Sequence, residues 1–522
     1  SSDVCSSDLV GMLAMGAGGL DVALAMGGGA YNINTPKVVK VNLEGKLNKM
    51  VASKDIILEV LRKLTVKGGV GKVFEYAGEG VKSLSVPQRA TITNMGAELG
   101  ATTSIFPSDE RTLEFFKAQG REEDWIEFKP DADALYDDEI TINLDELVPL
   151  AAGPHSPDNV KEVKEFGKIK VDQVAIGSCT NSSYEDLMKV AKILKGRKVN
   201  PNISLVIAPG SRQVMEMIAR NGALADIISA GARILENSCG PCIGMGQAPS
   251  TDAVSLRTFN RNFYGRSGTL SAKVFLVSPE TAAVSAITGV LTDPTELDVD
   301  LTIDMPKRFL IDDSMILAPA PTNAEVDVVR GPNIKPFPVN KPLGNSVEGK
   351  VLIKVEDNIT TDHIMPSNAK LLPFRSNIPY LSEFCFNTVD VEFHKRAKEY
   401  NGGFIIAGDN YGQGSSREHA ALAPLYLGVK AVIARSFARI HKANLINNGI
   451  IPMEFKEESD YNSIDLVDDL VIDNVKRSLE TGTVKVKNVT KGIEFEVTVN
   501  LTEKEINVIN VGGRLNYVKH SN

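Results

Sequence analysis

Cysteine is scarce in this chain and basic residues are fewer than acidic ones, and each feature argues against a class of protein. Five cysteines among 522 residues are too few for a disulfide framework, which favours a reducing compartment. Lys and Arg number 57 against 66 Asp and Glu, so the formal net charge is −9. This balance argues against general binding to nucleic acids or membranes but is compatible with a local basic pocket for a small anion. We therefore predict a cytoplasmic protein without a membrane or nucleic-acid partner.

Long hydrophobic runs are scarce as well. The most apolar stretch, residues 10–31, is rich in glycine and contains Asp21. We predict that it forms a buried, closely packed helix with flanking loops rather than a membrane span. No basic region precedes it, so a signal peptide is not expected. Residues 1–10, SSDVCSSDLV, repeat SSD and join abruptly to a well-patterned segment, so we interpret them as a non-native leader.

Strand and helix patterns alternate along most of the chain. Strand-like runs at 37–43 and 139–144 alternate with helical patterns at 52–64 and 110–120. From about residue 165, three strand patterns are each followed by a helical pattern: 171–177 by 184–196, 203–210 by 211–222, and 273–280 by 281–291. Repeated strand–turn–helix units predict parallel βαβ structure, in which ligands gather in loops beyond the carboxyl ends of the strands.

Residues 306–346 interrupt this alternation. They are rich in proline and show little helical periodicity, which predicts an extended linker between domains. Beyond the linker, apolar strand patterns and helical patterns resume and predict a second α/β unit. The sequence as a whole therefore predicts an α/β fold with several domains.

Three cysteines lie in turns rich in Gly, Ser and Asn. Cys179 follows a predicted strand, and Cys239 and Cys242 form a C-x-x-C pair within ENSCGPCIG. Thiolates hold iron–sulfur clusters, and this spacing lets two thiolates reach one cluster from a single turn. A [4Fe–4S] cluster on three cysteines leaves one iron open for Lewis-acid chemistry. A zinc site with a fourth ligand, a redox dithiol and a structural pair of small buried residues remain alternatives.

Two further motifs are typical of anion binding. TFNRNFYGR (258–266) places Arg261 and Arg266 five residues apart, and the guanidinium fork suits a carboxylate; a solvated basic loop is the alternative. GSSREHA (414–420) precedes an apolar helical pattern and predicts a helix N-terminus that favours an anion. A serine there could act as an alkoxide-like base, or it could simply cap the helix.

Together these motifs resemble the aconitase family. The resemblance covers nearly the whole chain from about residue 11, and its segments occur in the family's order; they are GSCTNSSYEDL, NSCGPCIG, NRNFYGR, DNITTDHI and GDNYGQGSSREHAAL. It implies three-layer α/β domains around a [4Fe–4S] cluster, together with a C-terminal swivelling α/β domain. It also implies the reversible isomerisation of citrate to isocitrate through cis-aconitate.

The same resemblance implies roles for individual residues. The cluster would be bound by Cys179, Cys239 and Cys242, and its fourth iron would bind the substrate hydroxyl and carboxylate. Ser415 would remove the carbon-bound proton, and the other catalytic residues would be Asp362, His363 and Glu98, the last from the segment NMGAELGATTS. The substrate would be bound by Arg261, Arg266, Arg375, Ser416, Arg417, Asn94 and Asn260.

The family also implies a domain plan. Its members carry an N-terminal stretch with a DSHT-type motif, so we expect this chain to be N-terminally truncated, which leaves its own activity an open question. The expected parts are the leader at 1–10, the remnant of an N-terminal domain at 11–36, a second α/β domain at 37–155, a third α/β domain with the cysteines at 156–305, the linker at 306–346 and the swivelling domain at 347–522.

Related activities remain alternatives. Within the superfamily these are homoaconitase, 2-methylisocitrate dehydratase and isopropylmalate dehydratase, the last of which usually has its small domain as a separate subunit. The fusion of both parts in this chain favours aconitase. An RNA-binding apo-protein is the alternative from another class, which the acidic balance disfavours. We expect a monomer that acts on a small di- or tricarboxylate.

Overall fold

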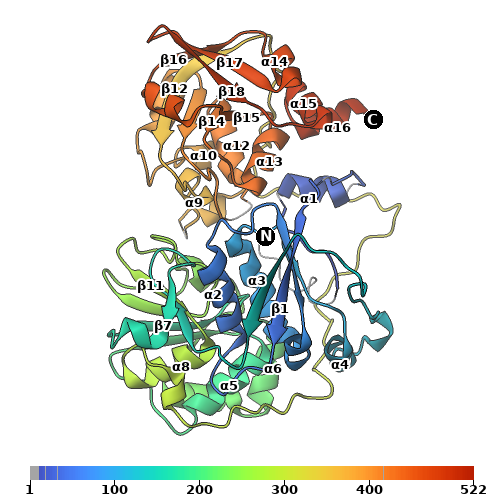
Figure 1. Ribbon diagram of the computed structural model, residues 1–522, viewed down its shortest axis with the longest axis vertical. Helices are drawn as coiled ribbons and strands as arrows, with labels where there is room; N and C mark the ends of the chain where they lie inside the picture. Colours follow the sequence, from blue (N-terminus) through green and yellow to red (C-terminus); the bar gives the residue numbers. More distant parts are fainter. Residues whose placement is uncertain are drawn as a thin grey trace. The chain divides into compact units, whose positions relative to one another are not determined.

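The computed structural model describes residues 11–521 apart from 18, 27, 32, 328, 369, 415 and 416 (Figure 1). The chain divides into two compact units. The larger unit comprises residues 34–325 together with 11–15, and the smaller unit comprises residues 326–521 together with 16–33. In the described part of the chain, every helix is too short or too polar to cross a membrane.

The larger unit begins with a parallel sheet of four strands in the order β3-β2-β1-β4. Its strands are β1 (Lys37–Glu44), β2 (Lys72–Ala77), β3 (Thr103–Ile105) and β4 (Asp138–Asn143). In β1 every second side chain is buried, including Val39 and Val41, because successive residues of a strand face opposite sides of the sheet. The helices of this region are α2 (Ser53–Leu64), α3 (Val86–Gly96) and α4 (Glu110–Ala118). The core of this region includes apolar side chains from β1, β2, α2 and α3.

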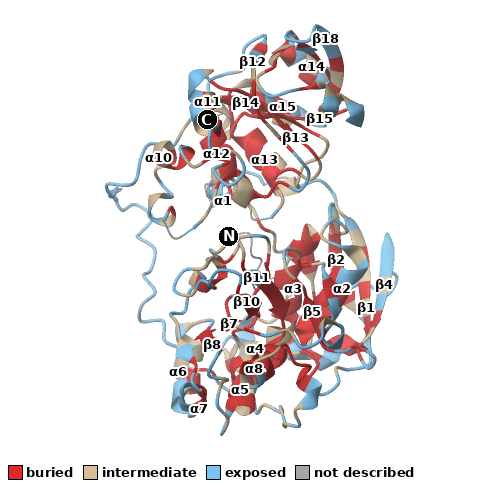
Figure 2. Cartoon of the chain, turned by 90° about the vertical axis from the view of Figure 1, so that its left-hand side faces the viewer, coloured by how far each residue is buried: buried red, intermediate tan, exposed pale blue. Residues whose placement is uncertain are grey.

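A second sheet of the larger unit has seven strands in the order β6-β5-β11-β10-β7-β8-β9. They are β5 (Leu150–Ala152), β6 (Val160–Glu162), β7 (Gln173–Gly177), β8 (Ser204–Ala208), β9 (Arg233–Ile234), β10 (Val254–Arg257) and β11 (Lys273–Val277). Strands β7 to β11 pair in parallel, whereas β5 and β6 are antiparallel. All five residues of β7 are buried (Figure 2), as expected for a central parallel strand.

Four helices accompany this second sheet. They are α5 (Tyr184–Leu194), α6 (Arg212–Arg220), α7 (Ala223–Ala230) and α8 (Pro279–Thr288). α5 packs against α7 and α8. α8 also contacts β7 (Figure 1). The loops after β7 and β10 leave the carboxyl ends of neighbouring parallel strands, so they emerge at the same edge of the sheet.

The smaller unit contains a closed barrel with the strand order β12-β13-β14-β15-β18-β17-β16. The strands are β12 (Val347–Val355), β13 (Gly403–Ala407), β14 (Val429–Ala434), β15 (Ile451–Phe455), β16 (Asp469–Ile472), β17 (Thr483–Asn488) and β18 (Ile493–Thr498). In β13, Phe404 and Ile406 join one core while Ile405 and Ala407 join another. The strand is therefore apolar throughout because both of its faces are covered.

The smaller unit also contains helices, most of which contribute apolar residues to these two cores. They are α1 (Gly19–Met26), α9 (Thr361–Ile364), α10 (Ile378–Ser382), α11 (Phe393–Glu399), α12 (His419–Tyr426), α13 (Arg439–Asn447), α14 (Val475–Thr481), α15 (Glu503–Asn510) and α16 (Arg514–Ser521). Apolar residues of α10, α11 and α12 share one core, and those of α14 and α15 belong to the other. The described residues between 306 and 346 form neither helix nor strand.

The structure confirms the predicted mixed α/β fold with parallel sheets and several domains, and corrects one local prediction. The apolar segment at 10–31 contains a helix, α1, but Leu20 is its only buried residue, and Met26 is 84% exposed. Polar contacts hold this helix instead: the backbone N–H of Leu20 donates to Glu418, and Asp21 accepts from Asn447 at 2.7 Å. Apolar composition therefore predicted a helix correctly but its burial wrongly.

Candidate functional site

Cys179 lies in the loop between β7 and α5. The loop leaves the strand at Gly177, whose φ is 134° and where a Cβ would meet the carbonyl oxygen of Ala208 at 2.1 Å. Only glycine tolerates this approach of the neighbouring strand. Ser178 follows in the left-handed region, with φ of 68°, and α5 is capped by Ser183, which accepts from the N–H of Asp186 at 3.1 Å. The turn leaves Cys179 exposed.

The C-x-x-C pair surrounds a short 3₁₀ helix, Gly240–Ile243, for which Cys239 is the capping residue. Cys239 is exposed, whereas Cys242 is buried and packs with Ala175 of β7, Val206 of β8 and Phe259 after β10. The pair therefore opens a turn of helix at the edge of the sheet where Cys179 emerges.

The surroundings of Cys242 favour its thiolate form. A hydrogen bond with Cys239 lowers the pKa of Cys242 well below its ordinary value, and the positive charges of Arg266 and Arg261 lower it further. Nη2 of Arg266 donates to Sγ of Cys242 at 3.5 Å. Because a soft metal binds thiolate rather than thiol, Cys239 and Cys242 fit a cluster site. Among the described residues, no group of three or more His, Cys, Asp and Glu side chains is gathered as a metal site.

Arg257, which the sequence analysis missed, holds the C-x-x-C turn in place. Its guanidinium is fully buried at the end of β10. It donates to the carbonyl oxygen of Pro241, between the two cysteines, and to Oε1 of Gln173 at 2.8 Å. Burial lowers the pKa of Arg257 to about 10. An arginine in a strand pattern carries no motif, so only the fold reveals this role.

Glu98 and Arg261 form a buried ion pair. Nε of Arg261 donates to Oε1 of Glu98 at 2.7 Å, and Nδ2 of Asn260 donates to the same oxygen at 3.3 Å. The side chains of Glu98 and Arg261 are only 2% and 4% exposed. The structure thus brings three predicted site residues together, although Asn260 and Arg261 lie 162 and 163 positions after Glu98 in the sequence.

Helix α3 joins this pair to the Cys179 loop. Asn94, in its last turn, accepts a hydrogen bond at 2.8 Å from the hydroxyl of Thr180, the residue after Cys179. The Nδ2 of Asn94 is buried and has no hydrogen-bond partner among the described residues, which makes it available to a bound group. The hydroxyl of Thr91, one turn earlier, donates to the carbonyl oxygen of Thr180 at 2.9 Å.

Lys54 is a second residue that the sequence did not indicate. It lies fully buried in α2, and its Nζ donates to the carbonyl oxygens of Thr258 at 3.0 Å and Phe259 at 2.6 Å. Burial lowers the pKa of Lys54 to about 7, against the opposing charges of Cys179 and Asp55. Lys54 therefore anchors the backbone that leads directly to Asn260 and Arg261.

In the smaller unit, Asp362 and Arg417 form the centre of a second polar group. Asp362 lies in α9, and its Oδ1 accepts from Nη1 of Arg417, which also donates to the carbonyl oxygen of Met365 at 3.3 Å. Arg417 is largely buried, while the side chain of Asp362 is 34% exposed. The polar group is thus partly accessible to solvent.

Two neutral imidazoles accompany this pair. Nδ1 of His363 accepts from the N–H of Thr360 at 3.1 Å, and burial lowers the pKa of His363 although Asp362 opposes the shift. Burial also lowers the pKa of His419, whose Nε2 lies 2.8 Å from the carbonyl oxygen of Arg375. This contact ties α12 to the segment that carries Arg375. The predicted helix start after GSSREHA is found at His419, and Ser415 and Ser416 lie outside the described residues.

A third imidazole, His441 of α13, supports the loop before Ser415. It is fully buried, and both of its ring nitrogens lack a hydrogen-bond partner within the described chain. Burial lowers the pKa of His441 to about 3. A Cβ on Gly412 would meet this ring at 2.3 Å, so the loop requires glycine at that position.

The arrangement suits chemistry on a carboxylated substrate. The larger unit has two arginines beside Cys242, whose pKa is lowered, and the smaller unit has an arginine oriented by a carboxylate. Guanidinium groups bind carboxylates, and thiolates bind iron–sulfur clusters.

Comparison with known proteins gives consistent matches. The sequence profile of the aconitase family (aconitate hydratase) matches residues 5–168 and 162–289, and that of the aconitase C-terminal domain matches residues 384–458. The chain is 35% identical to the probable mitochondrial aconitate hydratase of Dictyostelium discoideum, over 98% of this chain and 75% of that protein. It is 35% identical to the probable mitochondrial aconitate hydratase of Caenorhabditis elegans, over 98% and 74%. It is 32% identical to the mitochondrial homocitrate dehydratase of Saccharomyces cerevisiae, over 98% and 74%.

These relatives correct one prediction. All three are named as mitochondrial proteins, so the cytoplasmic location predicted from composition is wrong. Scarce cysteine separates reducing from oxidising compartments, but it does not separate one reducing compartment from another.

Proposed function

Because the chain belongs to the aconitase family and is therefore a hydro-lyase, we propose that it interconverts citrate and isocitrate through cis-aconitate. The observation that carries this proposal is the contact of Arg266 with Cys242. The positive charges of Arg266 and Arg261 both lower the pKa of this cysteine and so favour its thiolate form. A cluster ligand and carboxylate-binding groups are thereby provided by one short stretch of the larger unit.

We propose that Cys179, Cys239 and Cys242 hold the [4Fe–4S] cluster that the family implies. When bound by three cysteines, such a cluster supplies a Lewis acid for the departing hydroxyl through the iron that has no cysteine ligand. Arg257 keeps the C-x-x-C turn in place by its bond to Pro241, and Arg266 stabilises the charge on Cys242. A redox dithiol would use only Cys239 and Cys242 and leave Cys179 without a role, whereas a cluster uses all three cysteines.

The other residues of the larger unit bind and orient the substrate. Arg261 and Arg266 bind substrate carboxylates, and Glu98 fixes the orientation of Arg261 through the 2.7 Å bond at Nε. Asn260 shares the same carboxylate oxygen. The buried Nδ2 of Asn94 provides a donor to a substrate oxygen, since it has no other partner among the described residues.

The residues of the smaller unit remove the carbon-bound proton and bind the substrate beside it. The motif GSSREHA supports Ser415 as the group whose Oγ removes this proton, with Ser416 and Arg417 binding substrate beside it. Asp362 orients Arg417, and His363 is held neutral with its Nδ1 occupied as an acceptor. We assign Arg375 to another substrate carboxylate; its backbone is tied to α12 through His419.

Homocitrate-derived substrates are the second candidate, favoured by the match to a homocitrate dehydratase. The two functions differ in the length of the carbon chain that carries the distal carboxylate. We would reconstitute the chain anaerobically with iron and sulfide, and then measure cis-aconitate and cis-homoaconitate conversion side by side. We expect turnover of cis-aconitate to exceed that of cis-homoaconitate; the reverse order would establish the alternative, and iron-loaded protein that converts neither would contradict both.

We also propose a mitochondrial location, as for the named relatives. Fractionation of the source cells with an antibody against this chain would test it. Recovery with a mitochondrial marker is expected, and recovery elsewhere would contradict the proposal.

A further inference from the structure

The hydroxyl of Thr91 contacts the loop that follows Cys179. Thr91 lies in the middle of α3 and is 1% exposed. Its Oγ1 donates to the carbonyl oxygen of Thr180 at 2.9 Å and accepts from Nδ2 of Asn181 at 3.1 Å. A single side chain thus contacts both residues directly after Cys179.

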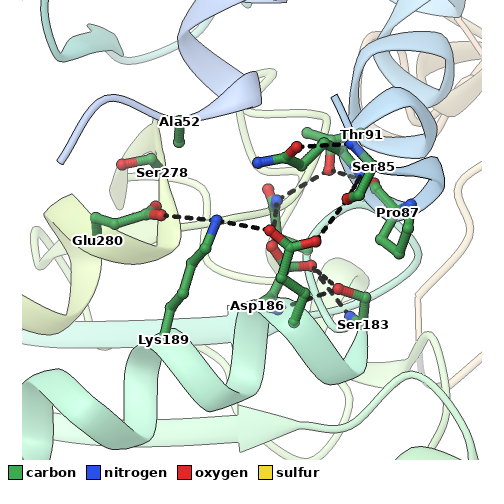
Figure 3. Close-up of polar contacts among 12 residues, drawn as sticks. Ala52, Ser85, Pro87, Thr91, Ser183, Asp186, Lys189, Ser278 and Glu280 are labelled. Carbon is green, nitrogen blue, oxygen red and sulfur yellow. Dashed lines mark hydrogen bonds and ion pairs between the residues drawn. The ribbon is translucent and has the colours of Figure 1, made fainter. Parts of the chain in front are cut away.

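This contact is unusual for a threonine inside a helix. Such a hydroxyl ordinarily bonds a carbonyl of its own helix, three or four residues earlier. Thr93, two residues further along α3, does so through the carbonyl oxygen of Ala90 at 3.3 Å. Thr91 has only a long contact of 3.5 Å to Pro87 of its own helix (Figure 3), and its shorter bonds go to a loop 89 and 90 residues away.

The loop is also held from its other side. Nδ2 of Asn181 approaches Oδ1 of Asp186 at 3.4 Å, and Oδ2 of Asp186 accepts from the hydroxyl of Ser183 at 2.7 Å at the start of α5 (Figure 3). Asn181 therefore lies between Thr91 of α3 and Asp186 of α5. The segment after Cys179 is fixed to two helices by side-chain bonds.

Helix α3 is itself fixed at its N-terminus. Ser85 caps the helix and donates to Oε2 of Glu185 at 2.5 Å. Lys189 pairs with Glu185 at 2.9 Å and lies 3.8 Å from Glu280 of α8 (Figure 3). This partly buried network links α3 to α5 and α8 and so supports the helix that carries Thr91.

We propose that Thr91 is a positioning residue for Cys179. Its hydroxyl holds the carbonyl of Thr180 and the amide of Asn181, and thereby fixes the backbone from which Cys179 presents its thiolate. The inference rests on the proposed function, in which Cys179 is a cluster ligand. Without the hydroxyl, two buried polar groups of the loop lose a partner, so the loop relaxes and the ligand is held less firmly.

The experiment compares Thr91→Val with Thr93→Val, since both remove one buried hydroxyl from the same helix. Each full chain is reconstituted anaerobically, and iron release to a ferrous chelator is timed. Thermal unfolding of the iron-free protein is measured in parallel. We expect Thr91→Val to release iron about 10- to 100-fold faster than the wild type, the scale on which residues behind the metal ligands change metal affinity. Thr93→Val should release it at the wild-type rate.

Thr91→Ser is the conservative variant. It keeps the hydroxyl and should restore slow release, even if the lost methyl group lowers the unfolding temperature. Equal release rates for wild type, Thr91→Val and Thr93→Val would overturn the inference and leave the cluster proposal intact. A wild-type chain that binds no iron would overturn both.

A second variant covers the case in which Thr91→Val does not fold. Asn181→Ala removes the other partner of the Thr91 hydroxyl from the loop side. Faster iron release from folded Asn181→Ala supports the inference, and release at the wild-type rate overturns it.

Discussion

The two units of this chain differ in how deeply their charged site residues are buried. In the larger unit, Glu98 and Arg261 are almost completely buried and bonded to each other, and Lys54 is fully buried against backbone carbonyls. In the smaller unit, Asp362 keeps a third of its side chain exposed while it orients Arg417. Buried pairs are rigid and costly to break, whereas exposed pairs contribute little to stability. The comparison suggests that the larger unit presents a preformed set of groups and that the smaller unit presents more adaptable ones.

Breaking the buried pair should have the largest effect. Glu98→Gln leaves the guanidinium of Arg261 without its counter-charge in a buried position, which costs about 3–5 kcal/mol in comparable pairs. We expect the free energy of unfolding, measured by urea denaturation of the iron-free chain, to fall by that amount. Turnover should fall as well, because Arg261 loses the bond that fixes its orientation.

The double variant Glu98→Gln/Arg261→Gln is the matched control. Because it removes both charges, it should recover part of the lost stability without restoring turnover. A loss of less than about 1 kcal/mol in Glu98→Gln, the scale of an exposed pair, would show that the two units do not differ in the way described.

The next prediction concerns the pH dependence caused by Lys54. Burial lowers its pKa from 10.5 to about 7, so between these values the unfolded chain binds a proton that the folded chain does not. The contribution of Lys54 to folding therefore becomes more favourable as pH rises from about 7 to about 10. Relative to Lys54→Met, which does not titrate, the wild type should gain at least about 1.4 kcal/mol, the equivalent of one pKa unit.

Urea denaturation of both proteins at pH 7 and pH 9.5 would measure this difference. Lys54→Arg serves as the control, since arginine stays charged across the range and should not show the gain. If the free energy of unfolding changed equally with pH in the wild type and in Lys54→Met, Lys54 would be charged in the folded chain throughout this range. Its carbonyl and carboxylate neighbours would then stabilise the charge enough to offset its burial.

The sequence predicted elements better than it predicted long-range contacts. The strand pattern at 171–177 and the helix pattern at 184–196 became β7 and α5 within two residues at each end, because periodicity and a capping serine are local signals. The roles of Lys54, Arg257 and Thr91 depend on backbone or side-chain groups that the fold brings to them. The residues next to Lys54 and Thr91 in the sequence do not indicate the bonds that these two side chains make to distant loops.

The candidate site shows the same division. The motifs identified Cys239, Cys242 and Arg266 because these residues lie within 28 positions of one another in a Gly-rich segment. The structure places Cys242 in contact with both Cys239 and Arg266. Glu98 and Arg261 are 163 positions apart in the sequence. Hydrophobic periodicity is a local signal and does not predict a contact between residues so far apart. Composition also predicted wrongly that the apolar helix α1 is buried, because composition does not indicate which part of the protein a helix packs against.

The smallest effect is expected for the exposed partner in the smaller unit. Asp362→Asn removes a charge whose side chain is 34% exposed and which solvent therefore screens. Arg417 is itself largely buried but retains its bond to the carbonyl oxygen of Met365, so we expect the free energy of unfolding to fall by less than the roughly 3–5 kcal/mol expected for Glu98→Gln. The KM for the tricarboxylate should rise, since Arg417 loses the carboxylate that orients it. We expect this rise in KM to be the main effect of the substitution and the loss of stability to be the minor one. Urea denaturation and steady-state kinetics on one preparation would measure both. A stability loss as large as that of Glu98→Gln would mean that the smaller unit, too, presents a rigid and preformed set of charges.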